Sequence, residues 1–169
     1  MTAGTAAGPV LRRPGNRLER RAVGYWTVRA AAAWLLLLGA QGLWSLFGPD
    51  GHGTLRQAAF AATAVAGAAH TLVMPSWRYR VHRWEAAPEA LYTQTGWLVE
   101  ERRIAPVSRI QTVDTARGPL EQLFGLTNVT VTTASAAGPL VIQGLGHTAA
   151  MELAASLTQR AQLAKDDAT

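Results

Sequence analysis

The sequence contains no cysteine and only one lysine among its 169 residues. Without cysteine, the chain has no disulfide framework, no thiolate metal site and no cysteine nucleophile. Charged residues are also sparse: they make up 16% of the chain, whereas soluble domains average about 25%. Apolar residues reach 49%, which excludes a disordered chain, because disorder requires low hydrophobicity and high charge. The length suits one ordinary domain, or a small domain with an additional segment.

Sequence patterns of familiar enzymes are also missing. The chain has no G-x-S-x-G, Walker, G-x-G-x-x-G or H-E-x-x-H pattern. The four histidines are far apart, at His52, His70, His82 and His147. This spacing does not suit a metal site. Glu100 and Glu101 are adjacent, so on a strand they point to opposite faces and favour pairing with Arg102-Arg103 over a shared acid–base site. We therefore predict no enzyme activity and no catalytic, cofactor or metal residue.

The net charge of +5 is concentrated in the first 29 residues. This arm holds six arginines and one glutamate, whereas residues 30–77 contain only Asp50 and Arg56 as charged side chains. A basic arm could contact nucleic-acid phosphates. Because it adjoins an apolar segment, we predict instead that it sets membrane topology and attracts anionic lipid head groups. The predicted partner is the lipid bilayer, with no nucleic acid.

Two long segments without charge follow the arm. Residues 30–49 contain no ionisable side chain, and residues 57–77 carry no formal charge. A helix rises about 1.5 Å per residue, so about 20 residues cross a hydrocarbon layer of about 30 Å. We predict transmembrane helices at about 30–47 and 56–74, joined by the turn-rich Gly48–Thr54. The alternatives are buried core helices, which would overfill so small a core, and a signal peptide, whose apolar region is shorter.

The arginines also indicate how these segments are oriented. Six precede the first predicted span, and Arg78, Arg80 and Arg83 follow the second, whereas the connecting loop has one arginine and one aspartate. Positive residues flank spans on the cytoplasmic side. We therefore predict a multi-pass protein of the plasma membrane with both termini in the cytoplasm. Three aromatic residues suit the interfacial belt of a membrane protein: Trp26, Trp77 and Tyr79.

Small residues recur every four positions in the second segment. They form one row of Ala58, Ala62 and Ala66 and another of Thr63 and Gly67. In lipid, such rows let two helix backbones approach closely. They predict packing on the first span or on another copy of the chain, and general alanine richness is the alternative explanation.

From Trp77 the pattern changes to the two-residue alternation of strands. Tyr79 and Val81 alternate with basic residues, and Val129 and Val131 alternate with polar ones. Further strand-like segments occur at residues 91–93, 97–104, 108–114 and 139–143, with a hairpin turn at 94–96. Five or six closely spaced strands favour antiparallel pairing.

Two helices are predicted between and after the strands. Pro119 near the start and Gly125 at the end indicate a helix of one or two turns, with Gly125 at positive φ and Leu123 buried. Thr148 is positioned to cap a final helix, whose apolar stripe should lie on the sheet or close an open barrel end. The stripe consists of Ala150, Leu153, Ala154, Leu157, Ala161 and Ala164.

The segment RIQTVDTARGPLEQLFGLTNVTVTTAS, residues 109–135, resembles the signature of the bacterial pleckstrin-homology (PH) membrane proteins of the YdbS-like group. Residues 78–108 and the order of arm, spans, strands and final helix are also similar to that group. The resemblance implies an α+β membrane protein with a two-helix transmembrane hairpin. The hairpin is followed by a PH-like bent antiparallel β-sheet, or half-open barrel, with a C-terminal capping helix.

The resulting division has an arm at 1–29, two helices within 30–74, a cytoplasmic PH-like domain at 75–165 and a tail at 166–169. A structural motif lies within the resembling segment. It comprises Gly118, Pro119, Leu120, Leu123 and Gly125.

PH domains are associated with phosphoinositide binding, which requires basic residues around the first hairpin. The corresponding turn, Glu85–Glu89, has two acids and no base, so we predict no specific head-group recognition. We predict a non-catalytic, membrane-anchored interaction or scaffold module, whose partner is a protein such as a paralogue with several PH-like domains, or a second copy. The alternative is a lipid-handling or transporter-associated subunit at the bacterial plasma membrane, with Gln41 and His70 as the polar residues inside the spans.

Only Met74–Ser76 separates the second predicted span from the strand predicted near Trp77. Three residues reach at most about 10 Å, so that strand would begin within the head-group layer. The side chains predicted to contact the membrane surface are Trp77, Arg78, Tyr79 and Arg80.

Overall fold

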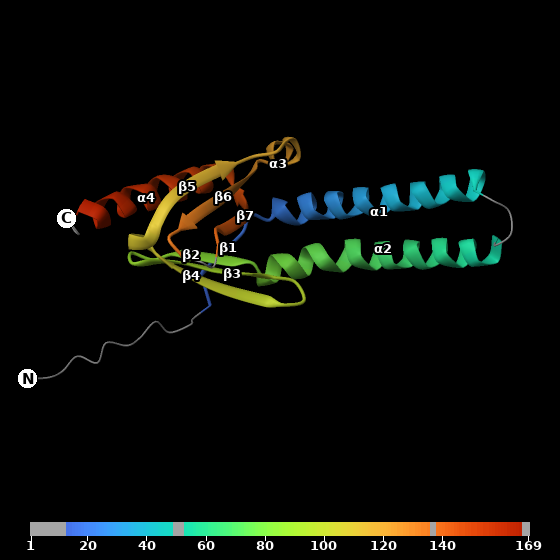
Figure 1. Cartoon of the computed structure of the whole chain (residues 1–169), viewed down its shortest axis with the longest axis horizontal. Coiled ribbons are helices and arrows are strands. Elements are labelled where there is room, and N and C mark those ends of the chain that lie inside the picture. The colour runs from blue at the N-terminus through green and yellow to red at the C-terminus, as the bar shows by residue number, and fades with distance from the viewer. Residues whose placement is uncertain (1–12, 49–52, 136–137, 167–169) are drawn as a thin grey trace, which may run out of the picture.

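The computed structural model describes residues 13–48, 53–135 and 138–166 of the chain. Two long helices run side by side and project from one end of a body made of strands and shorter helices (Figure 1). The long helices are α1, Arg21–Phe47, and α2, Gly53–Val81. Much of the predicted connector between them, residues 49–52, lies outside the described residues. The predicted α+β class with a helical hairpin is confirmed.

The body contains two antiparallel sheets, with strand orders β1-β2-β3-β4 and β5-β6-β7. The strands of the first sheet are β1 Asn16–Arg17, β2 Arg83–Ala86, β3 Ala90–Gly96 and β4 Glu100–Pro106. Those of the second are β5 Ile110–Ala116, β6 Leu126–Thr133 and β7 Leu140–Gly146. The short helices are η1 Val107–Arg109, α3 Pro119–Leu123 and the C-terminal α4, His147–Asp166.

The core of the body lies between the sheets and α4. Val129 and Val131 of β6 point inward and are fully buried, as their alternation predicts. One stripe of α4 packs against this core. The buried residues of that stripe are Ala150, Leu153, Leu157 and Ala161. The predicted cap differs slightly: α4 begins at His147, so Thr148 lies within the helix.

The helical hairpin is inserted between the first two strands of the body. β1 pairs antiparallel with β2, with Asn16 opposite Trp84, so the chain leaves the sheet, runs out along α1 and returns along α2. Leu18, Ala22 and Trp26 are buried in the core of the body. The end of the arm, which the sequence indicated to be separate from the PH-like domain, is therefore part of it.

The second long helix extends further than predicted. The strand expected from Trp77 is absent, because α2 continues through Pro75 to Val81. The His82 N–H still donates to the carbonyl oxygen of Arg78 over 2.9 Å, which is the helical pattern. An alternation of only two apolar residues, at positions 79 and 81, did not distinguish a strand from a helix end. The predicted linker between span and strand therefore does not exist.

The first long hairpin of the body also turns later than predicted. β3 continues through residues 94–96 to Gly96, which lies opposite Glu100 of β4. The turn is formed by the next three residues, Trp97, Leu98 and Val99. The polar composition of residues 94–96 suggested a turn, but these residues pair within the sheet.

The two long helices contact each other through a small number of specific pairs. Trp34 Nε1 donates to His70 Nδ1 over 3.1 Å, and Gln41 Nε2 donates to Thr63 Oγ1 over 3.0 Å. A Cβ atom at Gly67 would lie 2.9 Å from the Trp34 ring, so only glycine permits this approach. The predicted row of Thr63 and Gly67 thus packs on the first span. The other predicted row, Ala58, Ala62 and Ala66, is exposed.

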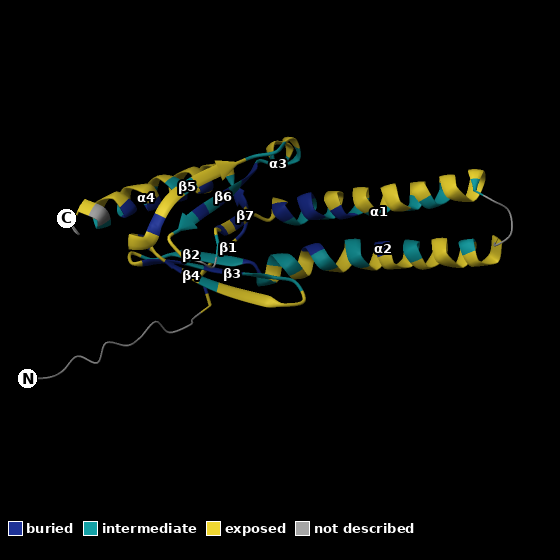
Figure 2. Cartoon of the chain, viewed as in Figure 1, coloured by how far each residue is buried: buried dark blue, intermediate teal, exposed yellow. Residues whose placement is uncertain are grey.

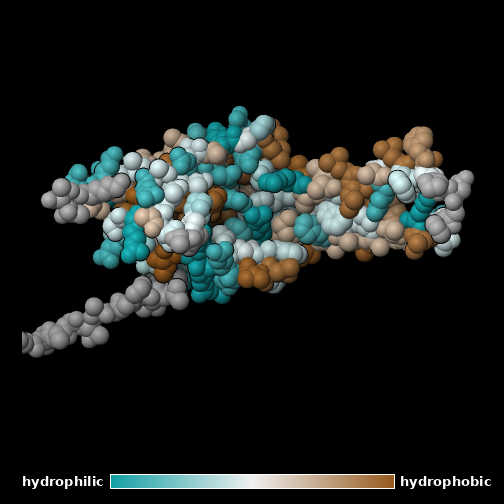
Figure 3. All heavy atoms as spheres, in the orientation of Figure 1, coloured by the Kyte–Doolittle hydropathy of each residue, from teal (hydrophilic) through white to brown (hydrophobic). Residues whose placement is uncertain are grey.

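Most side chains along the hairpin are apolar and exposed (Figures 2 and 3). Both helices are long and apolar enough to cross a membrane. Their exposure argues against the alternative of buried core helices, since water does not suit such a surface and lipid does. The pair therefore forms the transmembrane hairpin of the protein.

Candidate functional site

A cleft lies where α2 meets the gap between the two sheets. Its volume is about 540 Å³, and its walls come from α2, the β3–β4 hairpin and β7. β4 and β7 are the outer strands of their sheets and are not paired with each other in the described residues. A second cavity of about 280 Å³ adjoins it between α1 and α2, and both are lined by His70, Met74, Arg78 and Gln143.

Arg78 is the main cationic group shared by the two cavities. Its guanidinium stacks over the Trp26 ring at 4.6 Å from the centroid and donates from Nη2 to Gln143 Oε1 over 2.6 Å. Its Nε also donates to His82 Nε2 over 3.4 Å. Among the described residues these partners are all neutral. Arg78, predicted to contact the membrane surface, is thus held by the body.

The ring of His82 is buried beneath this arginine. Its Nδ1 donates to the carbonyl oxygen of Arg78 over 2.9 Å, and the ring packs on Trp26 with centroids 5.5 Å apart. With Nδ1 as the donor, Nε2 is left to accept from Arg78, which requires a neutral ring. Burial and the adjacent Arg78 cation lower the pKa of His82 to about 4. His82 is therefore neutral at physiological pH.

Arg29 faces the smaller cavity from the α1 side. Its Nη1 donates to the hydroxyl oxygen of Tyr25 over 3.0 Å, and that hydroxyl donates to Glu121 Oε1 over 2.7 Å. The bond from Tyr25 is the main cause that lowers the pKa of Glu121. This chain of contacts links α3 to the base of α1.

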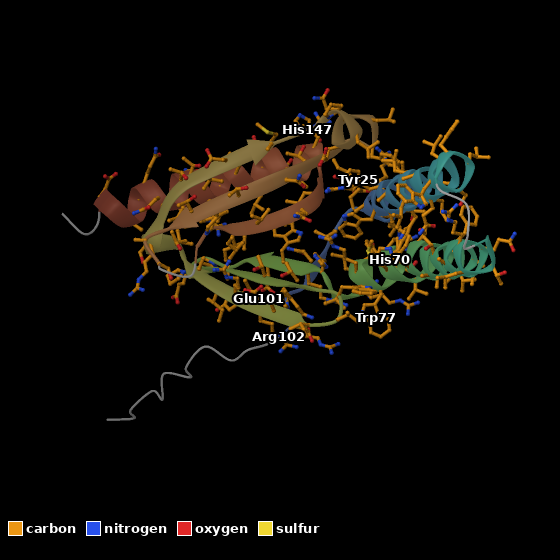
Figure 4. The ribbon with its side chains drawn as sticks, turned by 45° about the vertical axis from the view of Figure 1, so that its right-hand side comes forward. Tyr25, His70, Trp77, Glu101, Arg102 and His147 are labelled. Carbon is orange, nitrogen blue, oxygen red and sulfur yellow. The ribbon has the colours of Figure 1, made fainter. Side chains whose placement is uncertain are left out.

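Charged side chains on β4 pair along the strand. Arg102 lies 3.2 Å from Glu100, and Arg103 lies 3.5 Å from Glu101. Residues two apart on a strand share a face, so each acid pairs with a base, as the sequence predicts. Arg103 also donates to the carbonyl oxygen of Pro139 over 2.9 Å and bridges the gap between the sheets. Figure 4 shows Glu101 and Arg102 on this strand.

His70 lies on α2, lines the cleft and belongs to the uncharged segment of the hairpin. It accepts the hydrogen bond of Trp34, and its ring lies 5.6 Å from the ring of Trp97 in the β3–β4 turn. These contacts give His70 a structural role and attach the turn to α2; Figure 4 shows His70 on that helix. Within the described residues, no group of three His, Asp or Glu side chains could hold a metal, and His52 lies outside them.

The four residues predicted to contact the membrane surface do not share one face of α2. Since they lie on a helix, they point in different directions. Trp77 and Arg80 are exposed, Arg78 faces the cleft and Tyr79 packs against the core of the body. Trp26, predicted for the interfacial belt, is buried in the core.

The motif around α3 is partly as predicted. Pro119 begins the helix, and Gly125 has a φ of +67°, which only glycine adopts without strain. Leu123 is exposed, so its predicted burial is wrong. Leu120 and Phe124 contact the core instead, because residues four apart share a helix face and Leu123 lies beside that face. Gly118 precedes the helix at its N-cap position.

The turn at Glu85–Glu89 is not the first connection between strands of the body. Glu85–Glu89 links β2 to β3, whereas the connection between β1 and β2 is the entire transmembrane hairpin. The absence of specific head-group recognition, which was predicted from the acids of that turn, stays a prediction. No sequence signal identified β1, since two paired residues are too few for a pattern.

Comparisons with known proteins agree with this architecture. A family model described as "Bacterial PH domain" matches residues 25–161. The UPF0699 transmembrane protein YdbS of Bacillus subtilis (strain 168) is 33% identical over 95 residues, which cover 56% of this chain and 58% of that relative. The match thus spans little more than half of the relative. No solved structure matches the chain significantly.

Proposed function

The chain belongs to the bacterial PH domain family, and we propose that it is a non-catalytic interaction module whose partner is a protein. The transmembrane hairpin anchors the PH-like body to the membrane. We place it in the bacterial plasma membrane with both termini in the cytoplasm, on the basis of the arginines that flank the hairpin. The body would then meet its partner at the cytoplasmic surface.

β5, an outer strand that α4 also contacts, supports this role most directly. In the described residues β5 pairs only with β6, and it forms one edge of the three-stranded sheet. Only Ile110 of its seven residues is buried, and Figure 2 shows the strand as largely exposed. The strand contains neither proline nor lysine, the residues that commonly block such edges. An exposed edge of this kind can accept a strand from another protein.

The partner that fits this edge is a second PH-like domain. A paralogue with several such domains, or another copy of this chain, would present an equivalent edge. Anchoring in the same bilayer keeps two such bodies at one level and raises their effective concentration. A weak pairing of two strands could then suffice to hold the complex.

Site-specific photo-crosslinking in native membranes tests the proposal. A photo-reactive amino acid at Thr115 of β5 should form an adduct, whereas the same group at Thr158, an exposed residue of α4, should not. The mass of the adduct separates a paralogue from a dimer of this chain. Equal adducts at both positions, or none at Thr115, would contradict binding at the β5 edge.

One observation favours the alternative of a lipid-handling subunit. The cleft contains Arg78, whose described partners are neutral, and Arg29 faces the adjoining cavity. Two cations at the base of a transmembrane hairpin could bind a phospholipid phosphate. Under this alternative, Arg78→Gln should reduce the anionic phospholipid that copurifies with the protein, and Arg80→Gln should not. Unchanged lipid content in both variants would favour the interaction module.

A further inference from the structure

Two apolar projections extend from the body in the direction of the transmembrane helices. The first is the β3–β4 turn, which contains Leu98 and Val99, and the second is α3, which contains Leu123. Figure 1 shows them on opposite sides of the hairpin, and Figure 3 shows hydrophobic surface at both places. They are called the turn tip and the α3 tip below.

These tips hold the most exposed large apolar side chains that the structure describes outside α1 and α2. Leu98, Val99 and Leu123 are 82%, 80% and 79% exposed, and the next highest value is 57%, for Leu163. Exposed apolar residues scattered singly need no explanation. These three lie at the end of the body that faces the membrane helices, two on one side of the hairpin and one on the other, which indicates a common apolar partner.

Contacts with the hairpin set the depth of the turn tip. The Trp97 ring packs edge-to-face against His70, which in turn accepts a hydrogen bond from Trp34. Trp34 lies four residues beyond Ala30, where the segment without ionisable side chains begins. At about 1.5 Å per residue, this level is about 6 Å inside the apolar part of the hairpin. The turn tip thus reaches the depth at which lipid replaces water.

The α3 tip lies at a shallower level. Phe124, the residue next to Leu123, packs against Tyr25 with ring centroids 6.2 Å apart. Tyr25 precedes Ala30 by five residues, which places the α3 tip about 7 Å on the body side of the apolar part. This level corresponds to the head-group layer, where apolar side chains on amphipathic elements bind.

The polar residues near the turn tip are compatible with this position. Glu100 and Arg102 form one ion pair and Glu101 and Arg103 another, so the segment after the turn carries no net charge. The body also cannot move away from the bilayer, because only His82 separates α2 from β2.

We propose that the body docks on the bilayer through the turn tip and the α3 tip, with Leu98 and Val99 inserted more deeply than Leu123. Docking on both sides of the hairpin would hold the body in one orientation and keep the β5 edge at a constant height. It does not depend on which partner that edge binds.

Fluorescent labelling of the full chain tests this docking. Because the protein has no cysteine, single-cysteine variants Leu98→Cys and Leu123→Cys can each carry one environment-sensitive dye. Leu163→Cys is the matched control, since this leucine is exposed on α4, at the end of the body away from the hairpin. Each variant is reconstituted in vesicles of phosphatidylcholine and phosphatidylglycerol, and circular dichroism verifies the fold.

The dye at Leu98 should be quenched by lipids with a spin label in the acyl chain, and iodide in water should quench it several-fold less than the dye at Leu163. The dye at Leu123 should be quenched best by a spin label at the head group. Equal iodide quenching at Leu98 and Leu163 would overturn the proposal. Protection at Leu98 with full aqueous access at Leu123 would overturn docking on both sides.

Discussion

Leucine side chains are exposed on the transmembrane hairpin and buried in the core of the body. Leu36 and Leu46 of α1 are 76% and 77% exposed, whereas Leu91 and Leu126 in the body are fully buried. Helices can present leucine outward in lipid because their backbone groups are satisfied internally. The strands of the body pack their leucines inward, away from water. Outward-facing leucines thus indicate that lipid surrounds the hairpin, and inward-facing leucines indicate that water surrounds the body.

The two regions are joined without a linker. Ala22, Tyr25 and Trp26 lie on the first turns of α1 and are buried in or against the body, although the same helix continues into the hairpin. A continuous helix couples the orientation of the body to that of the hairpin. The two regions thus share one helix, whose first turns pack in the body and whose remainder faces lipid.

The largest expected effect is that the loop of the hairpin and the body lie on opposite sides of the membrane. We expect a reporter fused at Gly51 and one fused to the C-terminus to report opposite sides, because most of the arginines near the hairpin lie at its body end and Arg56 alone lies at the loop end. Enzymatic reporters that are active on one side of the membrane measure this directly. A C-terminal fusion active only outside the cytoplasm would contradict the predicted topology.

A matched pair of leucine variants compares the two regions energetically. Leu91→Ala in the buried core should lower the free energy of unfolding of the body by about 2–5 kcal/mol. Leu36→Ala, on the lipid-facing surface of α1, should change it by less than about 0.5 kcal/mol. Denaturant unfolding of the full chain in detergent measures both. Similar losses in the two variants would contradict the burial of Leu91 in the body and the exposure of Leu36 to lipid.

The buried His82 should make the stability of the body depend on pH. Its folded pKa of about 4 lies below the ordinary value of 6.5, first because of burial and then because of the Arg78 cation. The unfolded chain therefore binds the proton more readily, so stability is complete above about pH 6.5 and decreases as the pH falls towards 4. The loss between pH 7 and pH 5 should be about 2 kcal/mol.

Unfolding in detergent at several pH values measures this loss. The variant His82→Gln should remove it, whereas His147→Gln, at the start of α4, should retain it. A pH dependence that persists in His82→Gln would assign the effect to other groups.

An effect of similar size is expected for packing within the hairpin. Gly67→Ala should place a methyl group against the Trp34 ring and destabilise the helix pair by about 1–3 kcal/mol. Gly39→Ala is the control, because a Cβ atom there would meet nothing within 4 Å. Resistance of the hairpin to unfolding in strong detergent compares the two. Equal resistance would show that the close approach at Gly67 is not required.

Features with a local cause could be predicted from the sequence. The lengths of the uncharged segments indicated the hairpin, the 3.6-residue spacing indicated the buried face of α4, and a glycine after a short helix indicated the positive φ of Gly125. The candidate cleft could not be predicted in this way. Its walls come from α2, β3, β4 and β7, and no local pattern brings these elements together.

The sequence by itself determined that the chain has an apolar hairpin and a strand-rich body, because hydrophobic period and segment length depend only on neighbouring residues. Only the tertiary structure decided how the two are connected. Asn16 pairs with Trp84 across the whole hairpin, which makes the end of the arm part of the body. The same long-range packing turned Arg78 towards Trp26 and left Leu123 exposed. Such outcomes depend on which distant surfaces are available to bury a side chain, and that information is not local.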